Sequence, residues 1–437
     1  MLSVLGNRTY RHLFLAQIMA LLGTGLATVA LGLLAYNLAG GNAALVLGTI
    51  FTVKMVAYVF ISPLAGAWTD RMPRRTLLVL LDVVRAVVAL SLPFITEVWH
   101  VYVLIFALQS ASAAFTPTFQ ATIPDVLPDE AQYTRALSLS RLAYELENVI
   151  SPGLAALLLM FVPYESLFIG TFVGFLASAA LVISVTLPNT AAAEPRSAYY
   201  RTTKGLRIYL STPRLRGLLA LNFAAAAAGA MVLVNTVVLV RATLALDDTA
   251  VALGCFGVGS MLAAVALPSL LERVSERFLM IAGAMLMAVA LLTLAGWAAA
   301  FGLTWPGLLV TWLIAGVGYS AALTPSGRLL RRSAHSGDRP ALFAAQFSLS
   351  HVCWLVTYPL AGWLMTYAGP EPALLALSLI SIAAVGIGIA IWPSEDVDVL
   401  EHHHATLPLD HPHLHGERTH THTFIIDEHH ARWAARL

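Results

Sequence analysis

Histidines, which can bind metal ions, crowd the end of this chain. Ten of its fourteen histidines follow Leu400, mixed with acidic residues, and three of them alternate with other residues in the run HPHLH. Imidazole binds nickel, zinc, copper and iron, and alternate positions of an extended chain place ligands on one side. Because the tail is polar and of low complexity, we expect it to be disordered without metal. The predicted metal ligands are His402, His403, His404, His411, His413, His415, His420, His422, His429 and His430.

Three other interpretations of this tail stay open. An expression tag is one, although the histidines are interspersed with Pro, Leu, Thr and acidic residues and do not form one block. A pH-sensitive segment is another, since histidine titrates near neutrality. The third is a solvated terminus without a ligand. If the tail does bind metal, a mobile segment is better suited to capturing ions than to moving them across a membrane.

Ionisable residues inside apolar segments form a second group. Such a residue is costly at bilayer depth, so each one is a candidate functional residue. Alignment of two repeated halves sets Tyr144, Glu147 and Ser151 against His351, Trp354 and Tyr358, and we expect Glu147 and His351 to approach one central site from opposite halves as carboxylate and imidazole ligands. The structural alternatives are that Arg141 and Glu145 only form an ion pair and that Cys353 only fills apolar space. The transport-site candidates are Glu147, His351, Glu145, Tyr144, Asn148, Cys353 and Lys54.

The composition predicts the elements that position these residues. Of 437 residues, 58% are hydrophobic and 11% charged, whereas soluble domains carry roughly 25% charged residues. This excludes an ordinary soluble enzyme and predicts an all-α membrane protein, because a spanning helix needs about 20 apolar residues. We expect twelve such helices near residues 12–36, 45–68, 76–96, 101–123, 136–161, 165–187, 216–240, 249–271, 278–300, 304–325, 341–367 and 372–392.

The basic residues predict the orientation. Loops rich in Lys and Arg stay on the cytoplasmic side, and Arg241 is the single basic residue predicted on the opposite side. Both termini are therefore expected in the cytoplasm, in the cytoplasmic (inner) membrane of a bacterium. No cleavable signal peptide is evident. The expected domains are a six-helix half at 1–187, a cytoplasmic linker at 188–215, a second half at 216–393 and the histidine-rich tail at 394–437.

The two halves resemble each other in sequence. GAWTDRMPRR follows the second predicted helix, and PSLLERVSER follows the eighth at an offset of 202 residues. This offset aligns Asp70 with Glu272, Arg71 with Arg273 and Arg75 with Arg277. Two pseudo-symmetric six-helix repeats indicate a transporter whose substrate site lies between the halves.

The first of these loops resembles the signature loop of the major facilitator superfamily, with Pro73 in place of a glycine. That resemblance implies the major facilitator fold and a cytoplasmic latch that opens and closes during alternating access. The gating residues that it implies are Asp70, Arg71 and Arg75, with Glu272 and Arg273 in the second copy. The alternative is that these arginines only enforce topology.

A closer resemblance is to the NreB-type nickel-resistance exporters of that superfamily, which carry a histidine-rich cytoplasmic C-terminus. The stretches NRTYRHLFLAQ, QSASAAFTPTFQATIPDVLPDEAQYTRALSLSRLAYELE and RLRGLLALN look like that group. The resemblance implies a secondary exporter of a divalent transition-metal ion, nickel above all, that confers metal resistance. It is the only source of the expectation of nickel.

No GxxxxGK[ST] loop occurs, so we expect neither ATP hydrolysis nor another enzymatic activity. We expect proton antiport, in which a carboxylate such as Glu147 or Glu145 exchanges a proton for the metal. The metal is then substrate and tail ligand, with no tightly bound cofactor, and the partners are membrane lipid and coupling protons. A net charge of +1 gives no reason to expect nucleic acid, and we expect a monomer. The alternatives are an exporter of a siderophore, metal chelate or amphiphilic drug, or a membrane-anchored metal buffer or sensor.

Overall fold

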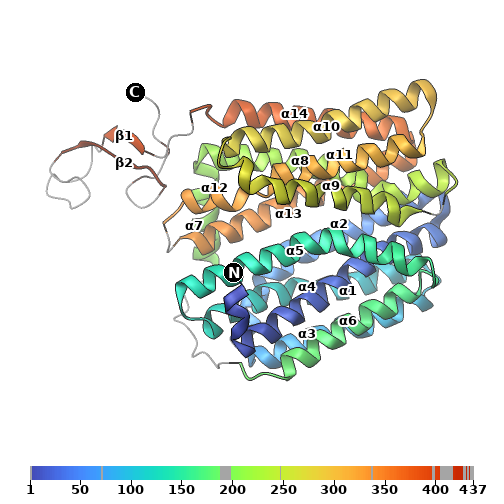
Figure 1. Cartoon of the computed structure of the whole chain (residues 1–437), viewed down its shortest axis with the longest axis horizontal. Helices are drawn as coiled ribbons and strands as arrows, with labels where there is room; N and C mark the ends of the chain where they lie inside the picture. Colours follow the sequence, from blue (N-terminus) through green and yellow to red (C-terminus); the bar gives the residue numbers. More distant parts are fainter. Residues whose placement is uncertain are drawn as a thin grey trace.

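The computed structural model of this chain describes residues 2–69, 72–187, 198–246, 248–335, 338–395, 399–403, 417–426, 430 and 433. Within these residues, twelve helices of 18 residues or more form the bundle in Figure 1. The prediction of an all-α membrane protein with twelve helices is confirmed. The long helices are α1 (Arg8–Ala39), α2 (Ala43–Thr69), α3 (Arg74–Ser91), α4 (Val98–Val126), α5 (Glu130–Leu159), α6 (Ser166–Ile183), α8 (Pro213–Val238), α9 (Thr249–Leu270), α10 (Glu276–Phe301), α11 (Trp305–Leu323), α13 (Arg339–Ala368) and α14 (Pro370–Ile391).

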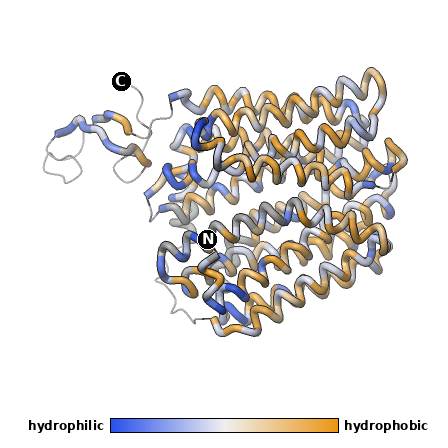
Figure 2. The backbone as a smooth tube through the Cα atoms, viewed as in Figure 1, coloured by the Kyte–Doolittle hydropathy of each residue, from blue (hydrophilic) through white to orange (hydrophobic). Residues whose placement is uncertain are grey.

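The long helices are apolar enough for a bilayer. Ten stretches of the described chain have the length and composition of membrane spans, and the first, Arg8–Ile61, contains most of both α1 and α2. Apolar residues run along the helices, while hydrophilic residues gather at their ends and in the tail (Figure 2). The chain is therefore a multi-pass membrane protein.

Glycine-rich turns separate two pairs of helices where the sequence predicts breaks. The turn between α1 and α2 is the short 3-10 helix η2 (Gly40–Asn42), and Gly40 has a φ of 53°. Gly302 ends α10 with a φ of 80°. Both values lie in the left-handed region, which a glycine adopts without steric strain.

The connection between the two six-helix sets contains a helix of its own. This helix, α7 (Ala198–Ser211), and the short α12 (Ser326–Arg332) lie at the end of the bundle near the N-terminus and the tail (Figure 1). Lys204 Nζ of α7 lies 2.6 Å from Asp338 Oδ1 at the start of α13. The Tyr209 hydroxyl donates to Gln346 Oε1 of α13 at 2.5 Å. Helix α7 of the linker is therefore attached to α13 of the second set of helices.

The two six-helix sets share a core at only one end of the bundle, as far as the described residues show. One apolar cluster there joins Leu34 of α1 and Leu47 of α2 with Val237 of α8 and Tyr358 of α13. At the end where the termini lie, one cluster draws on α7, α8, α10 to α14 and the tail, and a separate one draws on η1 (Leu2–Gly6), α1 and α3 to α6. The halves are thus held together mainly at the end away from the termini.

The expectation of a disordered tail is wrong for two segments that the structure describes as strands. Strand β1 (Val399–His403) pairs antiparallel with β2 (Thr419–Thr423), and His402 lies opposite His420 in the register. An isolated two-stranded sheet is marginally stable in water. This one is followed by Phe424 and Ile426, which are 2% and 1% exposed and belong to the core of the second half. Docking on the bundle therefore supplies the burial that a free hairpin lacks.

Candidate functional site

Five polar or aromatic side chains meet between the halves, midway along their helices. Helix α2 contributes Lys54 and Tyr58, α5 contributes Tyr144 and Glu147, and α13 contributes His351. Lys54 lies close enough to Glu147 and to His351 to interact electrostatically with both. The Tyr58 ring stacks on the His351 ring, with centroids 5.2 Å apart and planes 3° from parallel. A carboxylate of the first half and an imidazole of the second half thus share Lys54 as an electrostatic neighbour, and Lys54 Nζ lies 6.0 Å from the centroid of the Tyr58 ring.

The backbone near Glu147 leaves room for this group. Helix α1 has Gly25 where it faces α5, and a Cβ atom there would lie 2.1 Å from the Ser151 Cβ and 3.1 Å from Glu147 Oε1. Any larger residue would therefore push α5 or the carboxylate away. The glycine allows α1 and α5 to approach closely and lets the carboxylate lie against α1.

The His351 ring has one nitrogen fixed by its own helix. Its Nδ1 lies 2.6 Å from the Phe347 carbonyl oxygen. A carbonyl can only accept, so Nδ1 carries the proton and Nε2 of the neutral ring keeps a lone pair. Metal-binding histidines commonly have this arrangement, in which a hydrogen bond at one nitrogen orients the other. His351 is therefore chemically able to bind either a proton or a metal ion at Nε2.

Aromatic rings line one face of α13 beside this group. Phe347, His351, Trp354 and Tyr358 recur at helical spacing, and the Trp354 and Tyr358 centroids are 4.9 Å apart. Phe51 of α2 contacts Tyr358 across the halves at 5.0 Å. Sequence reasoning did not single out Tyr58 or Phe347 as site residues, although the spacing of four between Phe347 and His351 was visible.

Other transport-site candidates lie elsewhere or outside the described side chains. Cys353 is buried, its Sγ donates to the Leu349 carbonyl at 3.4 Å, and it interacts with Tyr209 of α7. It therefore faces the linker helix and not the group around Lys54. The side chains of Glu145 and Asn148 lie outside the described residues.

A buried ion pair lies within the first half. Asp82 and Arg85 of α3 pair with each other, and Ser178 of α6 donates to Asp82 Oδ2 at 2.8 Å. The Arg85 guanidinium lies over the Phe115 ring at 4.1 Å and the Phe175 ring at 4.5 Å. The pair therefore joins α3 to α4 and α6.

The first predicted latch is described in part. Asp70 and Arg71 lie outside the described residues. Arg75 donates to the Ile183 carbonyl at the end of α6, and its neighbour Arg74 pairs with Asp125 near the end of α4. Arg74 and Arg75 thus tie the start of α3 to two other helix ends of the same half.

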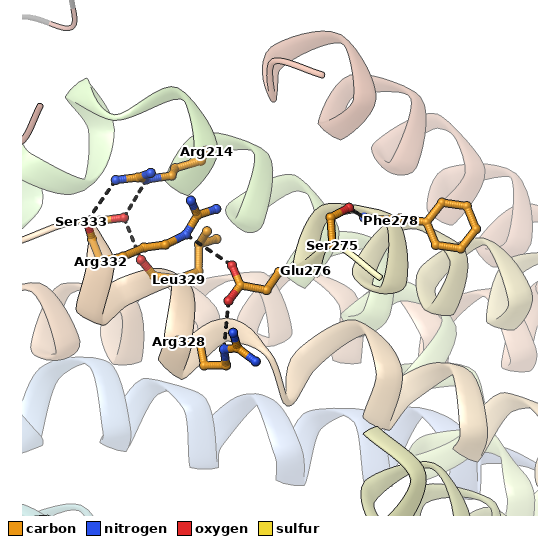
Figure 3. A network of polar contacts seen from close by, with 8 residues as sticks. All are labelled: Arg214, Ser275, Glu276, Phe278, Arg328, Leu329, Arg332 and Ser333. Atoms are coloured by element: carbon orange, nitrogen blue, oxygen red, sulfur yellow. Dashed lines mark hydrogen bonds and ion pairs between the residues drawn. The ribbon is translucent and has the colours of Figure 1, made fainter. Parts of the chain in front are cut away.

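The second copy of the predicted latch has its described ion pairs at another acid. Glu272 and Arg273 are exposed, whereas Glu276 forms ion pairs with Arg328, at 3.0 Å from its Nε, and with Arg332, at 3.1 Å from its Nε (Figure 3). Arg277 donates to the Trp392 carbonyl at 3.1 Å. The gating role of Glu272 and Arg273 stays a prediction.

The two copies of the repeated loop make corresponding contacts, but the acid and the base of one ion pair are exchanged between them. The repeat offset of 202 aligns Arg75 with Arg277, and both arginines donate to carbonyls at the end of a half's last helix. It also aligns Arg74 with Glu276, so the acid and the base have changed places. Sequence alignment of the repeats could have found this exchange, because opposite charges stand at one aligned position.

The histidine tail has no ready-made metal site in its described part. Among the described residues, no group of three or more His, Cys, Asp or Glu side chains is arranged to hold a metal ion. His403 Nδ1 lies 3.0 Å from Thr419 Oγ1, and the His420, His422 and His430 rings contact one another in sequence. The structure describes the backbone but not the side chain of His402. His404, His411, His413, His415 and His429 lie outside the described residues.

Comparison with known proteins identifies the family. The family model described as Major Facilitator Superfamily matches residues 13–292. The chain belongs to the Major Facilitator Superfamily. It is 28% identical over 133 residues to the uncharacterized MFS-type transporter YfiS of Bacillus subtilis, which is 30% of this chain and 31% of that protein. It is 26% identical over 122 residues to macrolide efflux protein A of Streptococcus pyogenes, which is 27% of this chain and 30% of that protein.

Solved structures of this superfamily's fold superimpose on nearly the whole chain. The nucleoside transporter NupG matches with a TM-score of 0.65 at 12% identity, covering 88% of this chain and 100% of that one. A bacterial homolog of the human lysosomal transporter Spinster matches with a TM-score of 0.66 at 12% identity, covering 88% and 95%. These likenesses concern the fold alone. The chain matches only about a third of the length of each curated relative. The cargo is therefore argued from the chemistry of the site and not from these relatives.

Proposed function

We propose that this major facilitator protein exports a divalent transition-metal ion, with nickel as the preferred cargo, in exchange for protons. One observation carries the proposal: Glu147 of the first half and His351 of the second half are both electrostatic neighbours of Lys54. Carboxylate and imidazole are ligands for a borderline divalent cation such as nickel. Ligands divided between the halves are what alternating access requires, because the cargo then contacts both parts that move.

Lys54 gives the exchange a physical basis. In the absence of cargo its ammonium balances the Glu147 carboxylate, so the charge is not left uncompensated at bilayer depth. An arriving metal ion takes the carboxylate and the free Nε2 of His351 and displaces the ammonium. After the halves reorient, a proton binds the carboxylate and the metal leaves. Proton and metal compete for one group, which couples their movements in opposite directions.

The tail and the charged end of the bundle fit this direction of transport. Basic residues concentrate at the end that carries both termini, which supports a cytoplasmic location for that end in a bacterial inner membrane. The histidines would then face the compartment from which metal is removed. We assign the tail to capture and buffering of the ion, with the transfer itself in the helices.

Nickel accumulation in cells tests this proposal. Cells lacking other nickel exporters and expressing the chain should hold less nickel than cells with the vector. Glu147→Gln should restore nickel to the vector level, because an amide neither binds a proton in this range nor balances a divalent ion. Glu97→Gln is the matched control, since Glu97 is an exposed glutamate in the turn before α4. Equal nickel in vector and wild-type cells, at equal expression, would refute the proposal.

A second candidate cargo is an amphiphilic organic molecule. The aromatic face of α13 favours it, since the Trp354 ring makes tilted contacts with Tyr358 and Tyr319 at centroid distances of 4.9 and 6.4 Å. Rings of this kind bind apolar and cationic organic surfaces. The name of the macrolide efflux relative is consistent with it. Efflux of a cationic dye that Trp354→Ala abolishes, with nickel accumulation unaffected by Glu147→Gln, would favour this candidate over metal export.

A further inference from the structure

The ion pair between Asp82 and Arg85 is fully buried but incompletely satisfied. Asp82 is 0% exposed and Arg85 is 4% exposed. Both oxygens of the carboxylate have a donor, because Arg85 donates to Oδ1 and Ser178 donates to Oδ2. The buried Nε of the guanidinium meets no acceptor among the described residues. Apart from the two phenyl rings that cover it, the Arg85 charge therefore depends on Asp82 for its compensation.

Ser178 suits either protonation state of Asp82. A serine hydroxyl can both donate and accept hydrogen bonds. It donates to the ionised carboxylate in this structure, and after rotation of its O–H bond it can accept from a protonated one. Helix α6 brings no competing group, because its sequence contains no acidic or basic residue, cysteine or tyrosine. Asp82 can thus take up a proton without losing its contact with α6.

Two tyrosines connect this pair with the candidate cargo site. Tyr58 of α2 has Arg85 and Glu147 as electrostatic neighbours. Tyr144 of α5 has the same two neighbours. Both hydroxyls also lie within hydrogen-bonding range of Thr116 on α4. The charges of Arg85 and Glu147 therefore act on the same two hydroxyl groups, in buried surroundings where such interactions are stronger than in water.

Other titratable groups on the neighbouring helices have other partners or lie far from the pair. Helices α2 and α4 carry, besides Tyr58, the side chains of Lys54, His100, Tyr102 and Asp125. Lys54 is an electrostatic neighbour of Glu147, and Asp125 pairs with Arg74. His100 and Tyr102 lie about 20 Å along α4 from Phe115, the residue of that helix under Arg85. Within the described part of the chain, Asp82 is thus the acid in direct contact with Arg85.

We propose that Asp82 binds the coupling proton and that Arg85 transmits its protonation to the cargo site. A proton from solvent forms an O–H bond at Oδ2, beside Ser178, and leaves the guanidinium charge uncompensated. That charge then opposes a divalent cation at Glu147, because both charges are positive and only buried groups separate them. Loss of the proton restores the ion pair and favours metal binding.

Proton and metal thus disfavour each other from two separate sites, in addition to competing for one carboxylate. The ion pair joins helices within the first half and also carries the signal between the two sites. The inference rests on the proposed function for the identity of the cargo. Proton binding to Asp82 itself is measured without metal.

Infrared difference spectroscopy of the full chain in detergent tests the proton site. A step to acidic pH should produce a carbonyl band of a protonated buried carboxyl group in the wild type. Asp82→Asn alone leaves the Arg85 charge buried and unpaired, which is destabilising. The double variant Asp82→Asn with Arg85→Gln removes both charges, so it should fold and lack the band. Asp248→Asn should keep the band as the matched control, because Asp248 is exposed and its side chain caps no helix.

Nickel binding to the same chains measures the coupling. Nickel should bind the wild type and the double variant, since neither Asp82 nor Arg85 is a proposed ligand, but the double variant should release fewer protons for each nickel bound. Ser178→Ala removes the hydrogen bond to the ionised carboxylate, so Asp82 keeps its proton to higher pH. The pH at which nickel binding is half-maximal should therefore move upward by roughly one unit. A merely structural pair predicts equal proton release and no such shift.

Two results would overturn the inference. Carboxyl bands that are the same in the wild type and the double variant show that Asp82 binds no proton. Equal proton release from these two chains at equal nickel binding shows that the two sites are not coupled. A wild-type chain that has the Asp82 band but binds no nickel would instead contradict the proposed function alone and leave the proton site standing.

Discussion

Replacing Gly362 with alanine should shift the balance between the two conformations of the bundle. Gly362 of α13 lies against α2 at the end where the halves share a core, and a Cβ atom there would lie 2.5 Å from the Ala44 carbonyl oxygen and 3.2 Å from Leu45 Cα. These are backbone atoms, so no side chain can give way. Ordinary van der Waals contact begins near 3.4 Å. Helices α2 and α13 must therefore move apart by roughly 1 Å to accommodate the added carbon.

The free-energy cost of Gly362→Ala applies to only one of the two conformations. Overpacking costs about 1–3 kcal/mol, and here it applies only while the halves meet at this end. A difference of that size changes the ratio of the two conformations by roughly 5- to 150-fold, since about 1.4 kcal/mol is a factor of ten. The variant should therefore populate the conformation that is open at the end away from the termini.

Spin labels on the two halves measure this shift. Phe161 after α5 and Phe301 at the end of α10 are exposed at this end of the bundle and accept cysteine without loss of core packing. Gly362→Ala should add a longer distance between the labels. Gly386→Ala is the matched control, because a Cβ atom at Gly386 meets nothing within 4 Å. An unchanged distance distribution, or the same change in the control, would refute the reasoning.

Two further predictions follow from the site and the charged end. Gly25→Ala should lower the rate of metal export and weaken cargo binding in a flux assay, because the added carbon displaces Glu147. Gly153→Ala on α5 is the control and should behave as wild type, since a Cβ atom there lies in open space. Glu276→Gln should change the rate of transport by several-fold, because it breaks two ion pairs that are partly shielded from solvent. Glu272→Gln should leave the rate unchanged, since Glu272 is exposed. Equal effects of the two glutamine variants would contradict the assignment of Glu276.

The membrane helices could be predicted from the sequence because their signal is local. Long uncharged apolar runs and the breaks at Gly40 and Gly302 determine the spans without knowledge of their packing. The sequence also predicted, through the internal repeat, that Glu147 and His351 approach one site, and in the structure both are electrostatic neighbours of Lys54. Tyr58 was missed because its place beside His351 depends on how α2 and α13 cross, which no periodicity reveals. Phe347 was missed although it lies one turn before His351 on the same helix.

The tail and the second latch show where local reasoning fails. The alternation THTHT at Thr419–Thr423 followed by Phe424, Ile425 and Ile426 is a strand signal with an apolar anchor. The polar composition nevertheless led to a prediction of disorder, because the surface that buries Phe424 and Ile426 lies on other helices and is not visible in the tail's own sequence. Glu276 was passed over for the same reason, since its partners Arg328 and Arg332 lie on α12, outside the repeated loop.

Nickel flux in proteoliposomes under an imposed proton gradient tests the central claim most directly. The full chain, a chain truncated after Ser394 and Glu147→Gln would be compared, with zinc, cobalt and iron as competing cargoes. The account predicts saturable nickel movement against proton movement in the full and truncated chains, and loss of both in Glu147→Gln. Absence of nickel movement in the full chain, or nickel movement unaffected by Glu147→Gln, would contradict it.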